Sequence, residues 1–166
     1  MRKLIVLLLC WGLGGCAAVI PLPDKPIINT RIFEASYVRV WDATLQSLTN
    51  SGEAITVAQK ESCLVNFQRK IPLCMLRGVA LAPKGVCALS NHWVIVFPYA
   101  QINLIVKQSD DSHTLVTINA KIVGDFGKPW TTFRAQELAS NGVLEKEYLD
   151  RIQVSLMRDK SAKDSK

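Results

Sequence analysis

The residue with the most distinctive chemical setting in this sequence is Cys16, which ends the run Leu13-Gly14-Gly15-Cys16. Arg2 and Lys3 give the N-terminus positive charge, and the apolar residues 4–9 follow without a break. A positive start, a short apolar stretch and small residues at a cleavage point are typical of an export signal. A cysteine placed directly after that point offers a thiol that can be acylated.

Small residues followed at once by cysteine resemble the lipobox of bacterial lipoproteins. The resemblance implies that residues 1–15 are a signal peptide and that Cys16 becomes the lipidated first residue, carrying palmitate or similar chains. Two acyl chains already give a stable membrane anchor, so three would make release negligible. Ala17 is not the aspartate that usually retains a lipoprotein at the inner membrane. The resemblance therefore implies an outer-membrane lipoprotein that faces the periplasm.

Two other interpretations of the N-terminus, a membrane-spanning helix and an ordinary secretory signal, fit the sequence less well. A membrane-spanning helix needs about 20 apolar residues, and Pro21 and Pro23 end this apolar run too early. An ordinary secretory signal would favour an Ala-x-Ala-like cleavage site and would leave Cys16 as a coincidence. The lipoprotein interpretation accounts for order, spacing and position together, so it is the one that we adopt.

Length and charge limit the function classes. The chain has 166 residues and a net charge of +6, which falls to +4 when Arg2 and Lys3 leave with the signal. About 150 residues suit one domain with its own core. Residues 158–166 read as a disordered basic tail, and no Lys/Arg stripe alternates with aromatic residues. The sequence thus predicts a membrane-associated protein with envelope protein partners and no nucleic-acid partner.

Three cysteines besides Cys10 and Cys16 would reach the oxidising periplasm. Cys74 and Cys87 flank a stretch that contains glycine and proline, so we expect them to form a disulfide bond. Cys63 lies in an alternating apolar pattern with Val65 and Phe67, which favours a small buried hydrophobic side chain. No histidine and polarising group accompany any of these cysteines, so none is predicted to be catalytic.

Hydrophobic periodicity predicts an α+β fold. Residues 16–30 contain prolines and read as a tether, and residues 31–157 read as one domain. Within this domain the patterns predict a short strand at 31–34, a helix at 36–50, a hairpin from 55 to 67, a long loop at 70–90, strands at 92–98, 100–106 and 114–122, a loop at 124–132 and a helix from 141. The expected architecture is a two-layer arrangement, with an antiparallel sheet of about five strands and two helices on one face.

A second resemblance rests on Val40-Trp41-Asp42-Ala43, on the Lys-Glu-Ser turn of the hairpin, and on Ser140-Asn141-Gly142-Val143-Leu144-Glu145. These runs look like those of small bacterial lipoproteins whose domains resemble the helix-grip modules of the β-barrel assembly machinery. The resemblance implies a helix-grip-like fold. It also marks one departure, because Cys63 stands where such sequences often have glycine.

Catalytic and cofactor motifs were sought in the sequence and not found. It has no phosphate-binding glycine loop, no nucleophile elbow and no His-Glu-x-x-His run. His113 lies near Asp110 and Asp111, but a closed metal site needs about four ligands, so we predict neither a metal nor a cofactor. The expected function is a non-catalytic binding or scaffolding module of an envelope complex. A small-ligand or lipid carrier and an envelope hydrolase are the alternatives.

A candidate contact surface is the predicted loop at 70–90. Leu76, Val79, Ala80 and Leu81 make it unusually apolar. These side chains could contact a partner, or they could fold over the core of their own domain. Long loops in compact domains are often functional, and sequence alone leaves both interpretations open.

Overall fold

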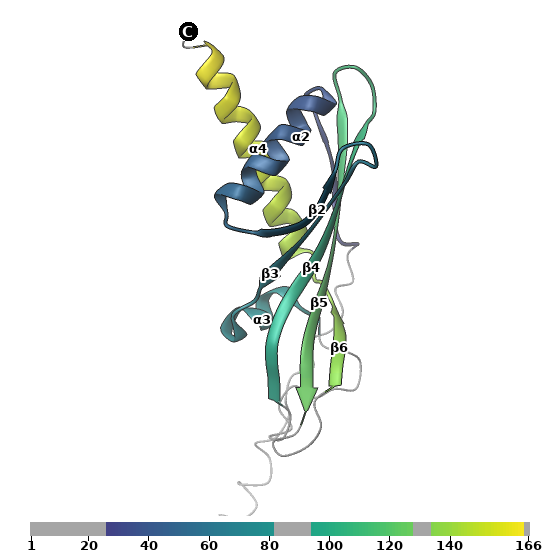
Figure 1. The fold of residues 1–166 in the computed structure, drawn as a ribbon, viewed down its shortest axis with the longest axis vertical. Coiled ribbons are helices and arrows are strands. Elements are labelled where there is room, and N and C mark those ends of the chain that lie inside the picture. The colour runs from purple at the N-terminus through teal and green to yellow at the C-terminus, as the bar shows by residue number, and fades with distance from the viewer. Residues whose placement is uncertain (1–25, 82–93, 128–133, 165–166) are drawn as a thin grey trace, which may run out of the picture.

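The computed structural model describes residues 26–81, 94–127 and 134–164. Its elements follow in the order β1 (Thr30–Phe33), α2 (Tyr37–Asn50), β2 (Ala54–Gln59), β3 (Leu64–Lys70), α3 (Leu73–Val79), β4 (Val94–Gln108), β5 (Thr114–Gly127), β6 (Arg134–Ala139) and α4 (Val143–Asp164). The fold is α+β, with helices packed on an antiparallel sheet, as the sequence predicts (Figure 1). The signal peptide, Cys16 and most of the tether lie outside the described residues.

The sheet has six strands in the order β1-β5-β4-β3-β2, and β6 also pairs with β5. All pairs are antiparallel. Strand β1 pairs with Thr114–Thr117 of β5, whereas β6 pairs with Lys121–Phe126 of the same strand. The two short strands therefore share one edge of β5, and a gap separates them.

Helices α2 and α4 lie side by side on one face of the sheet, and α3 packs lower on that face (Figure 1). Alternate residues of β3, β4 and β5 point into this layer, and the helices contribute the opposing side chains. The largest fully buried residues include Phe33, Val40, Leu48, Phe67, Ile102, Leu104, Ile118, Ile122, Leu144, Tyr148, Leu149 and Ile152. One continuous core thus lies between the sheet and the three helices.

Local sequence explains where α2 ends. Gly52 has a φ of 68°, a left-handed conformation that glycine adopts without steric cost. Its N–H donates to the carbonyl of Thr49 at 3.0 Å, and the N–H of Glu53 donates to Leu48 at 3.1 Å. These bonds satisfy carbonyls that the last turn would otherwise leave free. The helix therefore stops where the sequence predicts, and the chain turns back toward β2.

Helical spacing predicts that Val38, Trp41, Leu45 and Leu48 form the buried stripe of α2, and the observed stripe differs. Val38 is 50% exposed, whereas Val40, Ala43 and Ser47 are buried together with Trp41. Trp41 is a core residue, as its helical spacing suggests, and its ring stacks on that of Tyr37 at 6.0 Å. The buried face of the helix is therefore rotated relative to the predicted stripe and includes the small residues Ala43 and Ser47.

The structure corrects the prediction at five elements. The predicted strands at 92–98 and 100–106 form one long strand, β4, and the predicted loop at 70–90 contains the helix α3. Strand β5 continues to Gly127, and β6 follows where no strand was predicted. Helix α4 runs to Asp164, so the prediction of disorder from residue 158 is wrong for 158–164.

No helix in the described ranges combines the length and apolar composition needed to cross a membrane.

Candidate functional site

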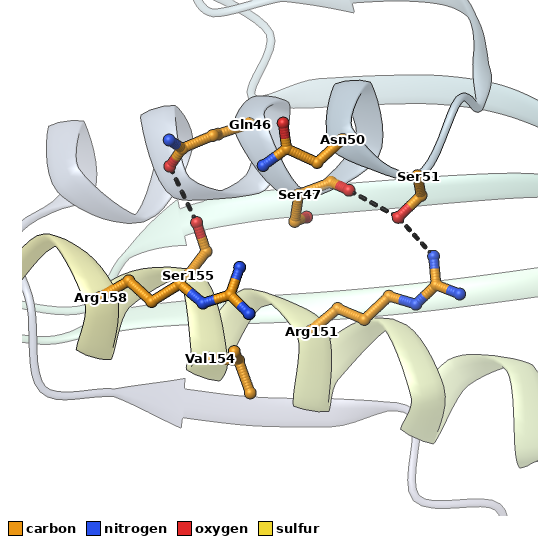
Figure 2. A pocket seen from close by; sticks show the side chains of 8 residues that line it. All are labelled: Gln46, Ser47, Asn50, Ser51, Arg151, Val154, Ser155 and Arg158. Atoms are coloured by element: carbon orange, nitrogen blue, oxygen red, sulfur yellow. Dashed lines mark hydrogen bonds between the residues drawn. The ribbon is translucent and has the colours of Figure 1, made fainter.

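A polar groove runs between α2 and α4. It encloses about 260 Å³ and is lined by Gln46, Ser47, Asn50, Ser51, Arg151, Val154, Ser155 and Arg158 (Figure 2). The two helices are held together across it by Ser155, whose hydroxyl donates to Oε1 of Gln46 at 3.0 Å. Both charged residues of this lining are arginines, so the groove has a positive potential that suits an anionic group.

Arg151 is held in place by groups from three elements. Its guanidinium donates to Glu147 one turn earlier on α4 and to the hydroxyl of Ser51 at the end of α2. A carboxylate oxygen of Glu53 lies 3.7 Å away. Glu147 also accepts a hydrogen bond of 2.9 Å from Arg69 on β3. Two arginines and two glutamates thus form a neutral network that joins α4 to α2 and to the sheet.

Tyr148 anchors this network in the core. Its ring lies between the guanidinium groups of Arg69 and Arg151, at 5.8 and 5.3 Å from its centroid, and meets Phe67 edge-on at 4.9 Å. Its hydroxyl donates to Oε1 of Glu53 at 2.7 Å. Burial, together with this bond, raises the pKa of Tyr148 above its ordinary value, so the hydroxyl stays a donor. The network therefore fixes Arg151, the member that lines the groove.

Arg158 differs from Arg151. Within the described residues, no hydrogen bond or ion pair holds its guanidinium, and the residue is exposed. Figure 2 shows its side chain extending along the groove toward the space beside Asn50 and Ser47. An arginine presents a planar fork of N–H donors that matches a carboxylate or phosphate. The groove therefore combines one fixed arginine with one that is available to a ligand.

The run from Ser140 to Glu145 leads into α4, and its polar side chains hold this junction together. Glu145 is buried, and its carboxylate accepts a hydrogen bond of 2.6 Å from the hydroxyl of Ser140. Its other oxygen accepts one of 3.3 Å from the backbone N–H of Ala120. Ala120 lies in the gap that β1 and β6 leave on β5, where its N–H has no strand partner. This buried acid therefore has a structural role.

The four apolar residues of the predicted contact loop are buried. Leu76, Val79, Ala80 and Leu81 are 6–7% exposed, and the first three belong to the core cluster. The N–H of Leu81 donates to Ala139 at 2.8 Å, which fastens this segment beside β6. The partner-contact interpretation of these residues is wrong. The alternative, that the segment folds over the core, is confirmed, because α3 completes the lower end of the helical layer.

Among the cysteines, Cys63 is half-buried and Cys74 is exposed on α3, and neither forms a disulfide within the described residues. Cys87 lies outside them, so the bond between Cys74 and Cys87 stays a prediction. Cys63 has a φ of 60°, a left-handed conformation just before β3. Its thiol interacts with Tyr37, whose pKa is raised to about 12 by burial and by this cysteine.

His113 and Asp110 form a hairpin turn. Nδ1 of His113 lies 2.8 Å from Oδ2 of Asp110. Hydrogen bonds from the backbone of Ser112 and from His113 lower the pKa of Asp110 to about 2. The turn uses these oxygens internally, and no group of three or more potential metal ligands occurs in the part of the chain that the structure describes.

No protein-family model and no curated protein sequence matches the chain. Among solved structures, it is similar to a crystal structure of the adenylate sensor from AMP-activated protein kinase in complex with 5-aminoimidazole-4-carboxamide 1-β-D-ribofuranotide. The likeness covers 76% of this chain and 94% of that chain, at 12% identity and a TM-score of 0.43. A likeness this remote carries no argument about fold or function.

Proposed function

We propose that this chain is a lipid-anchored, periplasm-facing outer-membrane lipoprotein that acts as a non-catalytic binding module of an envelope complex. The lipobox-like run at Cys16 supports the anchor. The observation that carries the binding role is the α2–α4 groove, with an available arginine beside a neutral, fixed network. An anchor restricts the domain to a shell near the membrane and so raises its effective concentration toward other tethered proteins.

The groove would receive an acidic side chain of a partner protein. Arg158 would pair with the carboxylate, and the amides of Asn50 and Gln46 could donate further hydrogen bonds. The volume of about 260 Å³ suits one side chain and not a folded segment. Arg151 would contribute little new charge, because Glu147 and Ser51 already hold it. Such a contact at a half-open surface weakens with salt.

The core weighs against the lipid-carrier alternative. A carrier of this architecture needs an apolar cavity between the sheet and its last helix. That space holds Phe67, Ile102, Tyr148 and Ile152, each about 1% exposed. These side chains fill the layer at the position where an apolar ligand would have to lie.

In-cell crosslinking tests this proposal. A photoreactive amino acid at position 50 would be introduced into the full-length protein, and adducts would be compared between the wild type, Arg158→Glu and Arg39→Glu. We expect a discrete adduct with an envelope protein, reduced at least tenfold by Arg158→Glu. Arg39→Glu makes the same charge change on an exposed part of α2 and should leave the adduct unchanged. An adduct insensitive to Arg158→Glu, or none at any expression level, would overturn the proposal.

A further inference from the structure

The face of the sheet opposite the helices is covered by no element among the described residues (Figure 1). Residues that pair directly across neighbouring antiparallel strands share a face. Gln101, Asn103 and Lys107 of β4 are exposed on this side, while the intervening Ile102 and Leu104 are buried under the helices. We call this the open face.

Phe97 of β4 borders the open face in a strained conformation. It is 82% exposed and has a φ of 51°, in the left-handed region that bulky residues rarely adopt. The strand pairing is interrupted between Val96 and Tyr99, so Phe97 and Pro98 form a bulge. Folding alone gains little from an exposed aromatic ring on strained backbone. Strain of this kind, held by the surrounding structure, points to a role in function.

The ring of Phe97 lines a hollow of about 580 Å³, together with Ala54, Gln68, Lys70, Ile71, Pro98 and Tyr99. Two aromatic rings and a proline make part of this wall apolar. Gln68 and Lys70 supply polar groups at the same place. The hollow therefore suits a ligand that has both apolar surfaces and hydrogen-bonding groups.

A row of side-chain amides continues from the hollow across the open face. Gln68 pairs with Gln101, and Asn66 pairs with Asn103, which in turn pairs with Asn119 on β5. Asparagine is depleted in strands, so three at paired positions are not explained by strand propensity. A side-chain amide has two N–H donors and one acceptor oxygen, and the oxygen of Asn119 already accepts a hydrogen bond of 3.0 Å from Asn29. Oδ1 of Asn66 is buried and accepts no hydrogen bond from any described residue.

The charges of the open face are few. Lys121 pairs with Glu137 at 3.1 Å, which leaves Lys70 in the hollow, Lys107 near the hairpin and Asp125 on β5. The surface therefore suits a ligand that is neutral or weakly anionic, carries donors and acceptors in series, and has C–H faces that can lie on aromatic rings. A peptide strand that joins a sheet uses the backbone at its edge, not side-chain amides on its face. Carbohydrate fits all of these features.

From this juxtaposition of an exposed strained aromatic, a hollow and a row of amides, we infer that the open face binds a glycan chain of the peptidoglycan type. Phe97 and Tyr99 stack on the sugar rings, and the amide row hydrogen-bonds the hydroxyl and N-acetyl groups. Neighbouring strands lie about 4.8 Å apart, a spacing close to the length of one sugar ring. The choice of peptidoglycan rests on the proposed periplasmic location, whereas the glycan chemistry rests on the face itself.

The test uses the full-length protein purified in detergent, with chitotetraose as the soluble probe in calorimetric titrations and isolated sacculi in pelleting assays. Phe97→Gly removes the ring and suits the left-handed backbone, so the fold should persist. It should weaken chitotetraose binding at least tenfold, and Asn103→Ala should weaken it several-fold. Val38→Ala truncates an exposed apolar side chain on α2 and serves as the matched control.

Several outcomes decide the inference. Glycan strands freed of their peptides by an amidase should still retain the protein, and cellotetraose, which lacks N-acetyl groups, should bind more weakly than chitotetraose. Retention by the peptides alone, unaltered binding by Phe97→Gly, or no binding of either probe would overturn it. Arg158→Glu should leave glycan binding intact. A failure at the open face is thus distinguishable from a failure of the groove.

Discussion

At the scale of single residues, Cys63 shows how a local conformation hides behind a sequence pattern. Alternation with Val65 and Phe67 predicts a buried strand residue, yet Cys63 closes the hairpin turn, and its N–H donates to the carbonyl of Lys60 at 3.2 Å. Its φ of 60° is one that glycine adopts without cost. The Lys-Glu-Ser run and the expectation of glycine at this position, which came from the proposed lipoprotein resemblance, were the sequence signals of this turn.

We predict that Cys63→Gly will be at least as stable as the wild type and that Cys63→Val will be less stable than Cys63→Gly. A left-handed φ costs a residue with a Cβ about 1–2 kcal/mol, and a β-branched side chain fares worst there. The urea midpoint of Cys63→Gly should equal or exceed that of the wild type. The free energy of unfolding of Cys63→Val should lie below that of Cys63→Gly by more than about 1 kcal/mol. Cys63→Ala controls for loss of the thiol. Equal stability of the Gly and Val variants would contradict the turn geometry.

Contacts between residues far apart in the sequence are also hidden from sequence patterns. Glu145 was noticed in the sequence only as part of a run, because its partner, the N–H of Ala120, becomes free only through the gap between β1 and β6. The pairing of Arg69 with Glu147 spans 78 positions. No periodicity or motif reports such contacts, so the groove between α2 and α4 could not be predicted from sequence.

At the scale of elements, the long amphipathic segments, the first strand and the hairpin were predictable, whereas α3 and β6 were not. The alternation in β4 and β5 and the helical spacing in α2 and α4 each recur over many residues, which makes their periods distinct. Strand β6 reads Arg-Ala-Gln-Glu-Leu-Ala, rich in helix formers. It becomes a strand because the C-terminal half of β5 offers it a ladder of hydrogen bonds. Tertiary pairing therefore overrides local propensity there.

Helix α3 lies where the sequence predicts a loop, and a substitution in it tests whether it packs into the core. Leu76 is 7% exposed in the core cluster, so Leu76→Ala should lower the free energy of unfolding by about 2–4 kcal/mol through lost burial and a cavity. Met75→Ala, at a half-exposed neighbour on the same helix, should cost less than about 0.5 kcal/mol. Urea denaturation followed by circular dichroism measures both. Equal small effects would mean that α3 does not pack as the structure has it.

At the scale of the whole molecule, the two faces of one sheet are put to different uses. The helices bury one face completely, and their outer surfaces form the groove around Arg158. The other face carries the row of amides and the exposed ring of Phe97. A domain held off the membrane by the proposed proline-containing tether could present both surfaces at once. In this proposal one surface would contact a neighbouring protein, while the other would contact a glycan.

That arrangement requires the anchor, and Cys16→Ser tests it. Serine has no thiol for the lipid, so the variant should lose labelling with palmitate, keep its signal peptide and migrate as a larger precursor. It should also leave the outer-membrane fraction, because the acyl chains are the proposed anchor and the variant would lack them. Cys10→Ser, inside the apolar run, is the matched control and should be labelled and fractionated like the wild type. Palmitate labelling that survives Cys16→Ser would exclude the lipoprotein interpretation, and with it the reason to expect either surface at a membrane.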